Sequence, residues 1–165
     1  MSAKSGIKLT GVFKVWGYYA DGRLKFYERV ENLIVNEGLN YLLDVALSAG
    51  TQKTTWYVGL KDTGTPAAGD TLASHASWNE LTNYTGNRKQ WVDGGVSGQS
   101  VNNNASPANF VFTSADDIYG LFLCAAETGT GDILFSAVDF ATPKSMDTDE
   151  SLDVKYTVNG ADDGA

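Results

Sequence analysis

The sequence predicts a mainly β fold: a single β-sandwich or jelly-roll-like domain over residues 10–160, with one α-helix at about residues 37–49 packed on it. Three observations lead to this prediction. Short segments of alternating apolar and polar residues recur along most of the 165-residue chain, as expected of strands with one buried face. Glycine is frequent (18 residues) and proline scarce (3), a balance that favours many tight turns. Only one segment has the apolar period of an amphipathic helix.

The first two strands are predicted at residues 12–19 and 23–30, joined by Asp21-Gly22. An Asp-Gly pair between two alternating segments is the strongest short signal for a β-hairpin. Apolar and basic residues alternate in the second segment, so this hairpin should have one buried and one solvated face.

The helix follows directly. Asn36 is expected to cap its first turn and Gly50 to close its end. Apolar residues form one complete stripe along it, which we expect to face the core; a partner-binding face is the alternative. The stripe consists of Leu39, Leu42, Leu43, Ala46 and Leu47.

The rest of the domain is predicted as strands and turns. The further strands are expected at residues 54–60, 110–113, 118–126, 133–140 and 151–158. Residues 118–126 are apolar on both faces, which indicates a central strand covered on both sides. At the two ends we expect a flexible basic arm at residues 1–9 and an acidic tail at residues 161–165.

The net charge of −8 argues against nucleic acid as a partner. The charges are unevenly distributed: residues 1–30 hold six bases and two acids, whereas residues 139–165 hold seven acids and two bases. A basic start and an acidic end of the chain can steer one copy onto another, or onto a charged protein lattice. The alternative is that both are simply solvated.

We expect the protein to be made in a cytoplasm, to remain soluble and to bind no membrane. Its longest apolar stretch, residues 118–126, is far shorter than the ~20 residues of a membrane-spanning helix. Its start lacks the pattern of a secretory signal peptide. A single cysteine, Cys124, cannot form an internal disulfide, and its apolar neighbours indicate a small buried side chain.

The sequence contains no catalytic constellation that we can assemble, so we predict no enzyme activity, no cofactor and no metal. The single histidine, His75, follows Ser74, but adjacent residues of an extended chain point to opposite faces. Residues 64–69 have the glycine spacing of a phosphate loop, but Asp70 stands where the lysine belongs. Residues 147–150 resemble the opening of a calcium loop without its glycine, and we interpret them as a solvated acidic turn.

Aromatic and polar residues gather in the middle of the chain and suggest an interface, because Trp, Tyr and Arg are the usual anchors of protein contacts. Together with two lysines of the arm they form the predicted interface for capsid docking or self-association. These residues are Lys4, Lys8, Trp78, Tyr84, Arg88 and Trp91. Two alternatives stay open: the tryptophans fill the core, or they form a carbohydrate-binding face.

From about residue 32 to residue 158 the chain resembles a family of tailed-bacteriophage structural proteins. The motifs that carry the resemblance are NEGLN at 36–40, WYVGL at 56–60, DTLASHASWNEL at 70–81, Arg88 with Trp91, GLFL at 120–123 and LFS at 134–136.

The resemblance implies a non-enzymatic virion protein, a head decoration or cement protein that binds and stabilises the outer surface of the capsid. Its partners would be the major capsid protein and itself, with a trimer favoured. It would reside in the virion, and in the host cytoplasm during assembly. The alternative within the same family is a structural or carbohydrate-binding module of the tail, baseplate or fibre.

Overall fold

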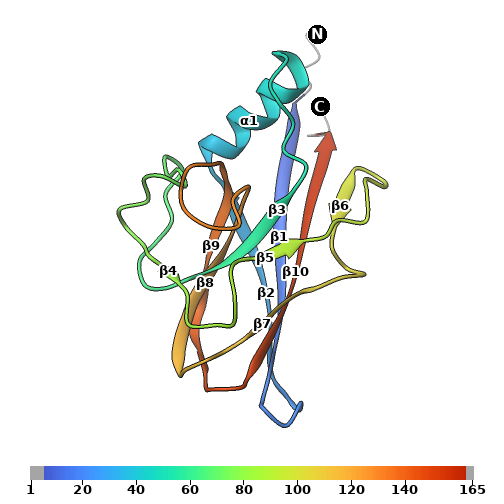
Figure 1. The fold of residues 1–165 in the computed structure, drawn as a ribbon. Coiled ribbons are helices and arrows are strands. Elements are labelled where there is room, and N and C mark those ends of the chain that lie inside the picture. Colours follow the sequence, from blue (N-terminus) through green and yellow to red (C-terminus); the bar gives the residue numbers. More distant parts are fainter. Residues whose placement is uncertain (1–5, 163–165) are drawn as a thin grey trace.

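A computed structural model describes residues 6–162, which form ten antiparallel strands and one α-helix (Figure 1). The strands are β1 (Ile7–Tyr18), β2 (Leu24–Ile34), β3 (Trp56–Lys61), β4 (Glu80–Leu81), β5 (Lys89–Trp91), β6 (Ser100–Asn102), β7 (Ala108–Val111), β8 (Asp116–Cys124), β9 (Leu134–Met146) and β10 (Ser151–Asp162). The helix, α1, spans Asn36–Leu47.

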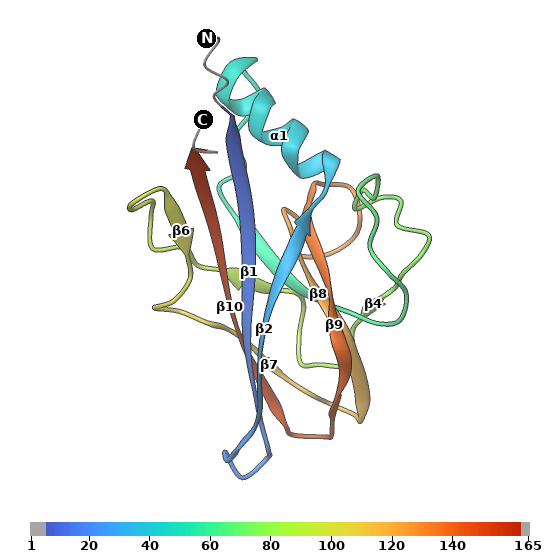
Figure 2. The ribbon, with the colours of Figure 1, turned by 180° about the vertical axis from the view of Figure 1, so that it is seen from behind.

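The strands form one curled sheet whose two halves face each other. The order is β4-β3-β8-β9-β2-β1-β10-β6, with β5 beside β3 and β7 beside β10. The halves join where Leu33 and Ile34 of β2 pair with Ala137 and Ser136 of β9, and beyond this point β2 and β9 diverge (Figure 2). The predicted mainly β, sandwich-like fold with one helix is confirmed.

The main core lies between the two halves. Phe13 of β1 and Tyr156 of β10 are fully buried there and stack with ring centroids 4.1 Å apart. The Tyr156 hydroxyl accepts hydrogen bonds from the Asn32 amide (2.9 Å) and the Ser136 hydroxyl (3.1 Å). Burial raises the pKa of Tyr156 well above its ordinary value, so this hydroxyl stays neutral. Leu152, Val154 and Tyr156 are buried and the residues between them are less so, which is the alternation that predicted a strand at residues 151–158.

Strand β8 is covered on both sides, as its apolar sequence predicted. Leu121 faces the main core, whereas Phe122 and Cys124 belong to a second cluster on the opposite side of the sheet. That side is covered by the loop at residues 62–79, and not by the helix. Burial raises the pKa of the Cys124 thiol to about 11, so at neutral pH it is a protonated, apolar side chain, as expected.

The hairpin forms at Asp21-Gly22, with Gly22 at a φ of +85° that favours glycine. Its first strand, however, begins at Ile7, so the prediction of a flexible arm is wrong for residues 7–9. These residues pair with Gly160, Ala161 and Asp162. Pairing between strands uses backbone donors and acceptors. The side-chain pattern of residues 7–9 therefore gave no sign that they extend the strand.

The same pairing corrects the predicted acidic tail, because Ala161 and Asp162 belong to β10. The basic start and the acidic end of the chain therefore run side by side and are not separate poles. Lys8 lies exposed in β1. Lys4, like residues 163–165, lies outside the described residues.

Helix α1 begins beside the joined ends of β2 and β9, and its C-terminal end reaches the start of β1 (Figures 1 and 2). Its N-cap is Val35 and not Asn36, whose N–H instead donates to the carbonyl oxygen of Ala68 (2.8 Å). At the other end the C-cap is Ser48, and Ala49, not Gly50, adopts the left-handed conformation (φ of 59°). Gly50 follows, and its N–H donates to the carbonyl oxygen of Asp44 (3.0 Å). No helix within residues 6–162 is long and apolar enough to cross a membrane.

Candidate docking surfaces

The two tryptophans of the predicted interface are buried. Trp78 and Trp91 are at most 7% exposed. The indole N–H of Trp78 donates to Asp70 Oδ2 (2.9 Å), and that of Trp91 donates to the carbonyl oxygen of Tyr156 (3.1 Å). The alternative that the tryptophans fill the core is the one found, so neither is available to a partner or to a sugar.

Tyr84 and Arg88 are largely buried as well, so little of either side chain is open to a partner. Arg88 donates from Nε and Nη2 to the two carboxylate oxygens of Glu80 (2.8 and 2.7 Å). Its Nη1 donates to the carbonyl oxygens of Ala126 and Gly129 (2.9 Å each). The arginine thus ties the turn between β8 and β9 to β4, a structural role that its position in the sequence did not indicate.

The other motifs considered above also have structural roles. The His75 ring stacks on Trp78, with centroids 3.9 Å apart. Asp70, at the lysine position of a phosphate loop, accepts the hydrogen bond from the Trp78 indole. In the acidic turn, Glu150 is buried and forms an ion pair with Lys25 (2.6 Å). Among residues 6–162, no group of three or more His, Cys, Asp or Glu side chains could hold a metal ion.

Of the leucines in the predicted stripe, only Leu42 turns towards the core, and the other three point away from it. Leu39, Leu43 and Leu47 are 37%, 59% and 82% exposed, so the prediction that they face the sheet is wrong. The reason is Gly38, which lies against β9: a Cβ added there would be 2.4 Å from the carbonyl oxygen of Phe135. This close approach turns the glycine side of the helix inward and the three leucines outward.

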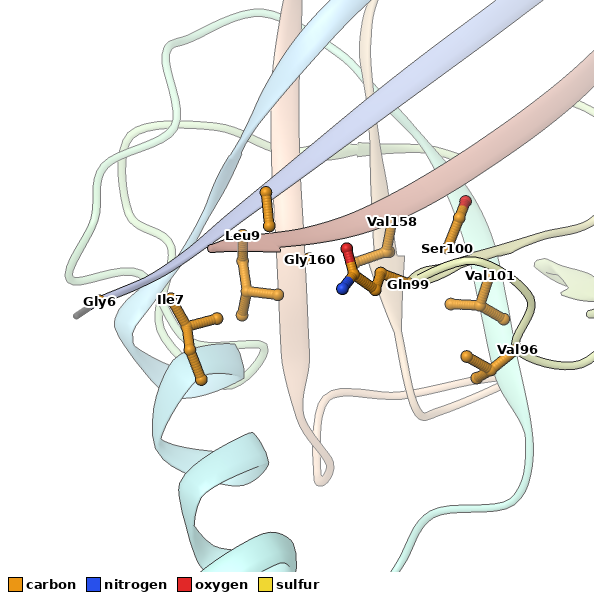
Figure 3. Close-up of a pocket in the computed structure, with 10 residues that line it drawn as sticks. Gly6, Ile7, Leu9, Val96, Gln99, Ser100, Val101, Val158 and Gly160 are labelled. Carbon is orange, nitrogen blue, oxygen red and sulfur yellow. The ribbon is translucent and has the colours of Figure 1, made fainter. Parts of the chain in front are cut away.

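The inward face of α1 is built by Tyr41, Leu42 and Val45, which are half-buried and cover a hollow of about 320 Å³. A second hollow of about 510 Å³ adjoins it between the start of β1, the end of β10 and β6. Leu9 and Val101 line both hollows, and Figure 3 shows them among apolar side chains from separate segments.

Two exposed apolar residues, Ile7 and Val96, line these hollows, whereas Leu39, Leu43 and Leu47 are exposed on the outward side of α1 at the same end of the domain. We call the set the apolar end: Ile7, Leu39, Leu43, Leu47 and Val96. Both views place the C-terminal end of α1 near the start of β1 (Figures 1 and 2). Ile7 and Val96 line the same hollow. Isolated exposed apolar residues are ordinary, whereas a group on one end of a domain marks an interaction site.

Glu37 holds α1 over this end of the sheet, a role that the sequence did not reveal. Its Oε2 accepts hydrogen bonds from the backbone N–H of Leu72 (3.0 Å) and of Leu134 (2.6 Å). An acidic residue in the first turn of a helix is an ordinary local signal, and nothing in the sequence points to partners so far along the chain.

The orientation of α1 predicts different costs for two neighbouring leucines. Leu43→Ala should change the free energy of unfolding by no more than about 0.5 kcal/mol, because the side chain is exposed and alanine favours helix. Leu42→Ala should cost about 1–2 kcal/mol, part of the cost at a full core position. Urea denaturation of both variants measures the difference, and a Leu43→Ala loss above about 2 kcal/mol would contradict this orientation.

Comparison with protein-family models and with curated proteins finds no match to this chain, so the resemblance to phage structural proteins stays a prediction.

Proposed function

We propose that this chain is a non-enzymatic structural protein of a tailed-phage virion, a head decoration protein that docks on the outer surface of the capsid through its apolar end. The observation that carries the docking proposal is the exposed face of α1 formed by Leu39, Leu43 and Leu47. The inward face of the same helix covers an apolar hollow. The capsid as partner rests on the sequence resemblance.

The apolar end has the properties that docking requires. Burying one leucine side chain contributes about 1.5–3 kcal/mol, so the three leucines of α1 supply a useful part of a binding free energy. The helix is held in place by Glu37 and by the Gly38 contact, so little ordering is needed on binding. Lys8 is exposed in β1, but its side chain points to the face opposite that of Ile7 and Leu9, so it lies outside the apolar end.

The proposal is tested by adding purified protein to empty heads that lack it and measuring co-sedimentation. The variant Leu43→Ser/Leu47→Ser should bind at least about tenfold more weakly, because two apolar contacts are lost. Leu24→Ser is the matched control: Leu24 is 55% exposed, but it lies beside the hairpin turn, at the opposite end of β1 and β2 from α1.

Two results would overturn the proposal. If the double variant bound empty heads as well as the control does, the apolar end would not be the docking surface. If the intact protein bound tail structures and not heads, the tail-associated alternative would replace the decoration role.

A further inference from the structure

Three basic side chains lie side by side on the outer face of the sheet, away from the apolar end. Lys14 of β1 is directly opposite Arg29 of β2 and Lys155 of β10. Directly opposite residues share a face, with Cβ atoms about 4.5–5.5 Å apart. We call Arg29, Lys14 and Lys155 the basic row. Lys14 and Arg29 are exposed, and Lys155 is half-exposed.

Little inside the protein offsets this concentration of charge. Like charges directly opposite each other on a sheet destabilise it. Arg29 has one exposed partner, Glu31, at 3.4 Å, and Lys155 lies over the Trp16 ring at 5.3 Å. Lys14 has no hydrogen bond or ion pair within residues 6–162. An anion that binds across the row would relieve the repulsion.

Aromatic side chains border the basic row. In the next row along the same strands, Trp16 lies opposite Tyr27, with ring centroids 5.1 Å apart, and Tyr27 is exposed. Arginine, tyrosine and tryptophan together are the residues enriched in protein interfaces. The surface therefore combines positive charge with flat apolar area on a rigid sheet.

We propose that the basic row, with Trp16 and Tyr27, binds a carboxylate-rich surface of another protein. The arrangement favours a protein over a nucleic acid, because acidic residues lie in the rows on either side. Glu31 is in the row beyond Lys14, and Asp153 lies opposite Trp16. A continuous polyphosphate would run past these carboxylates, whereas separate carboxylates on a folded surface can meet the three cations alone. This inference does not depend on docking through the apolar end.

The test uses the full chain and a poly-L-glutamate too short to extend past the basic row as the acidic probe. A longer oligothymidylate, which must pass the flanking carboxylates, represents the competing class. Lys14→Gln/Lys155→Gln should weaken poly-L-glutamate binding at low salt at least about tenfold. The control Arg23→Gln/Lys53→Gln removes the same number of positive charges outside the basic row. It should change the affinity for poly-L-glutamate less than about twofold. Amide chemical shifts of Lys14, Trp16 and Tyr27 should move on titration.

Three outcomes would overturn the inference: no binding of poly-L-glutamate at low salt, equal losses in the two double variants, or tighter binding of oligothymidylate. Sedimentation velocity without a probe tests whether the acidic partner is a second copy of this chain, an outcome that would support the inference. If the wild type, but not the Lys14→Gln/Lys155→Gln variant, self-associates at low salt, the basic row binds a second copy of this chain. A folding defect is separable, because removing like-charge repulsion should leave the thermal midpoint equal or higher.

Discussion

Replacing Glu80 by alanine is expected to lower the free energy of unfolding by about 3–5 kcal/mol, because Arg88 would stay buried without its carboxylate. The Arg88 side chain is 5% exposed, and both of its short hydrogen bonds to a charged group are made to Glu80. The two carbonyl oxygens that it also contacts carry only partial charges. Urea denaturation followed by circular dichroism measures the loss.

Two further variants separate charge burial from simple loss of a side chain. In Glu80→Leu/Arg88→Met the pair is replaced by apolar groups, and most of the stability should return. Asp21→Ala breaks an exposed pair with Arg23 and should be indistinguishable from wild type. A loss below about 1 kcal/mol for Glu80→Ala would show that the backbone carbonyls alone suffice to hold Arg88.

Replacing Glu37 by alanine is expected to cost about 2–6 kcal/mol, since two buried amides would each lose their acceptor at about 1–3 kcal/mol. Those amides belong to Leu72 and Leu134, whose side chains are fully buried. Because one carboxylate oxygen serves both, the loss should release α1 from the loop at residues 62–79 and from β9 together. Because α1 carries three residues of the apolar end, its release should also weaken docking through that end.

Hydrogen exchange shows where this loss acts. In Glu37→Ala the amides of α1 should exchange faster, whereas those of β1 and β10 keep their protection relative to global stability. Glu37→Gln retains one acceptor oxygen and should recover part of the loss. Asp44→Ala, an exposed change on the same helix, is the control. Unchanged exchange in α1 for Glu37→Ala would mean that packing of the helix, and not this carboxylate, holds it.

The helix shows what the sequence could and could not predict. Its existence followed from the apolar period, but two apolar stripes run along it: three leucines on one side, and Tyr41, Leu42 and Val45 on the other. The predicted stripe combined Leu42 of the inward side with the three leucines of the outward side. The side that packs is decided by Gly38, through a contact with Phe135 that no local pattern encodes.

Most strands were predictable because one buried face imposes alternation, as in β10, and burial on both faces removes it, as in β8. The candidate site was not predictable in the same way. Trp78 and Trp91 belong to a residue type common both in interfaces and in cores, and the sequence cannot distinguish the two. The basic row depends on the register of Lys14 with Arg29 and Lys155, and Lys155 lies far along the chain.

The pairing of β1 with β10 has a consequence for synthesis. All 12 residues of β1, from Ile7 to Tyr18, pair with β10, the last of the ten strands along the sequence. On a ribosome, β1 and β2 can form their hairpin early, but the other edge of β1 must wait until residues 151–162 have emerged. Such long-range closure is slow, and an open edge is a template for pairing with other chains. Chains that end before β10 are therefore expected to aggregate. Only when β10 has paired with β1 is the open edge of β1 closed to pairing with other copies of the chain.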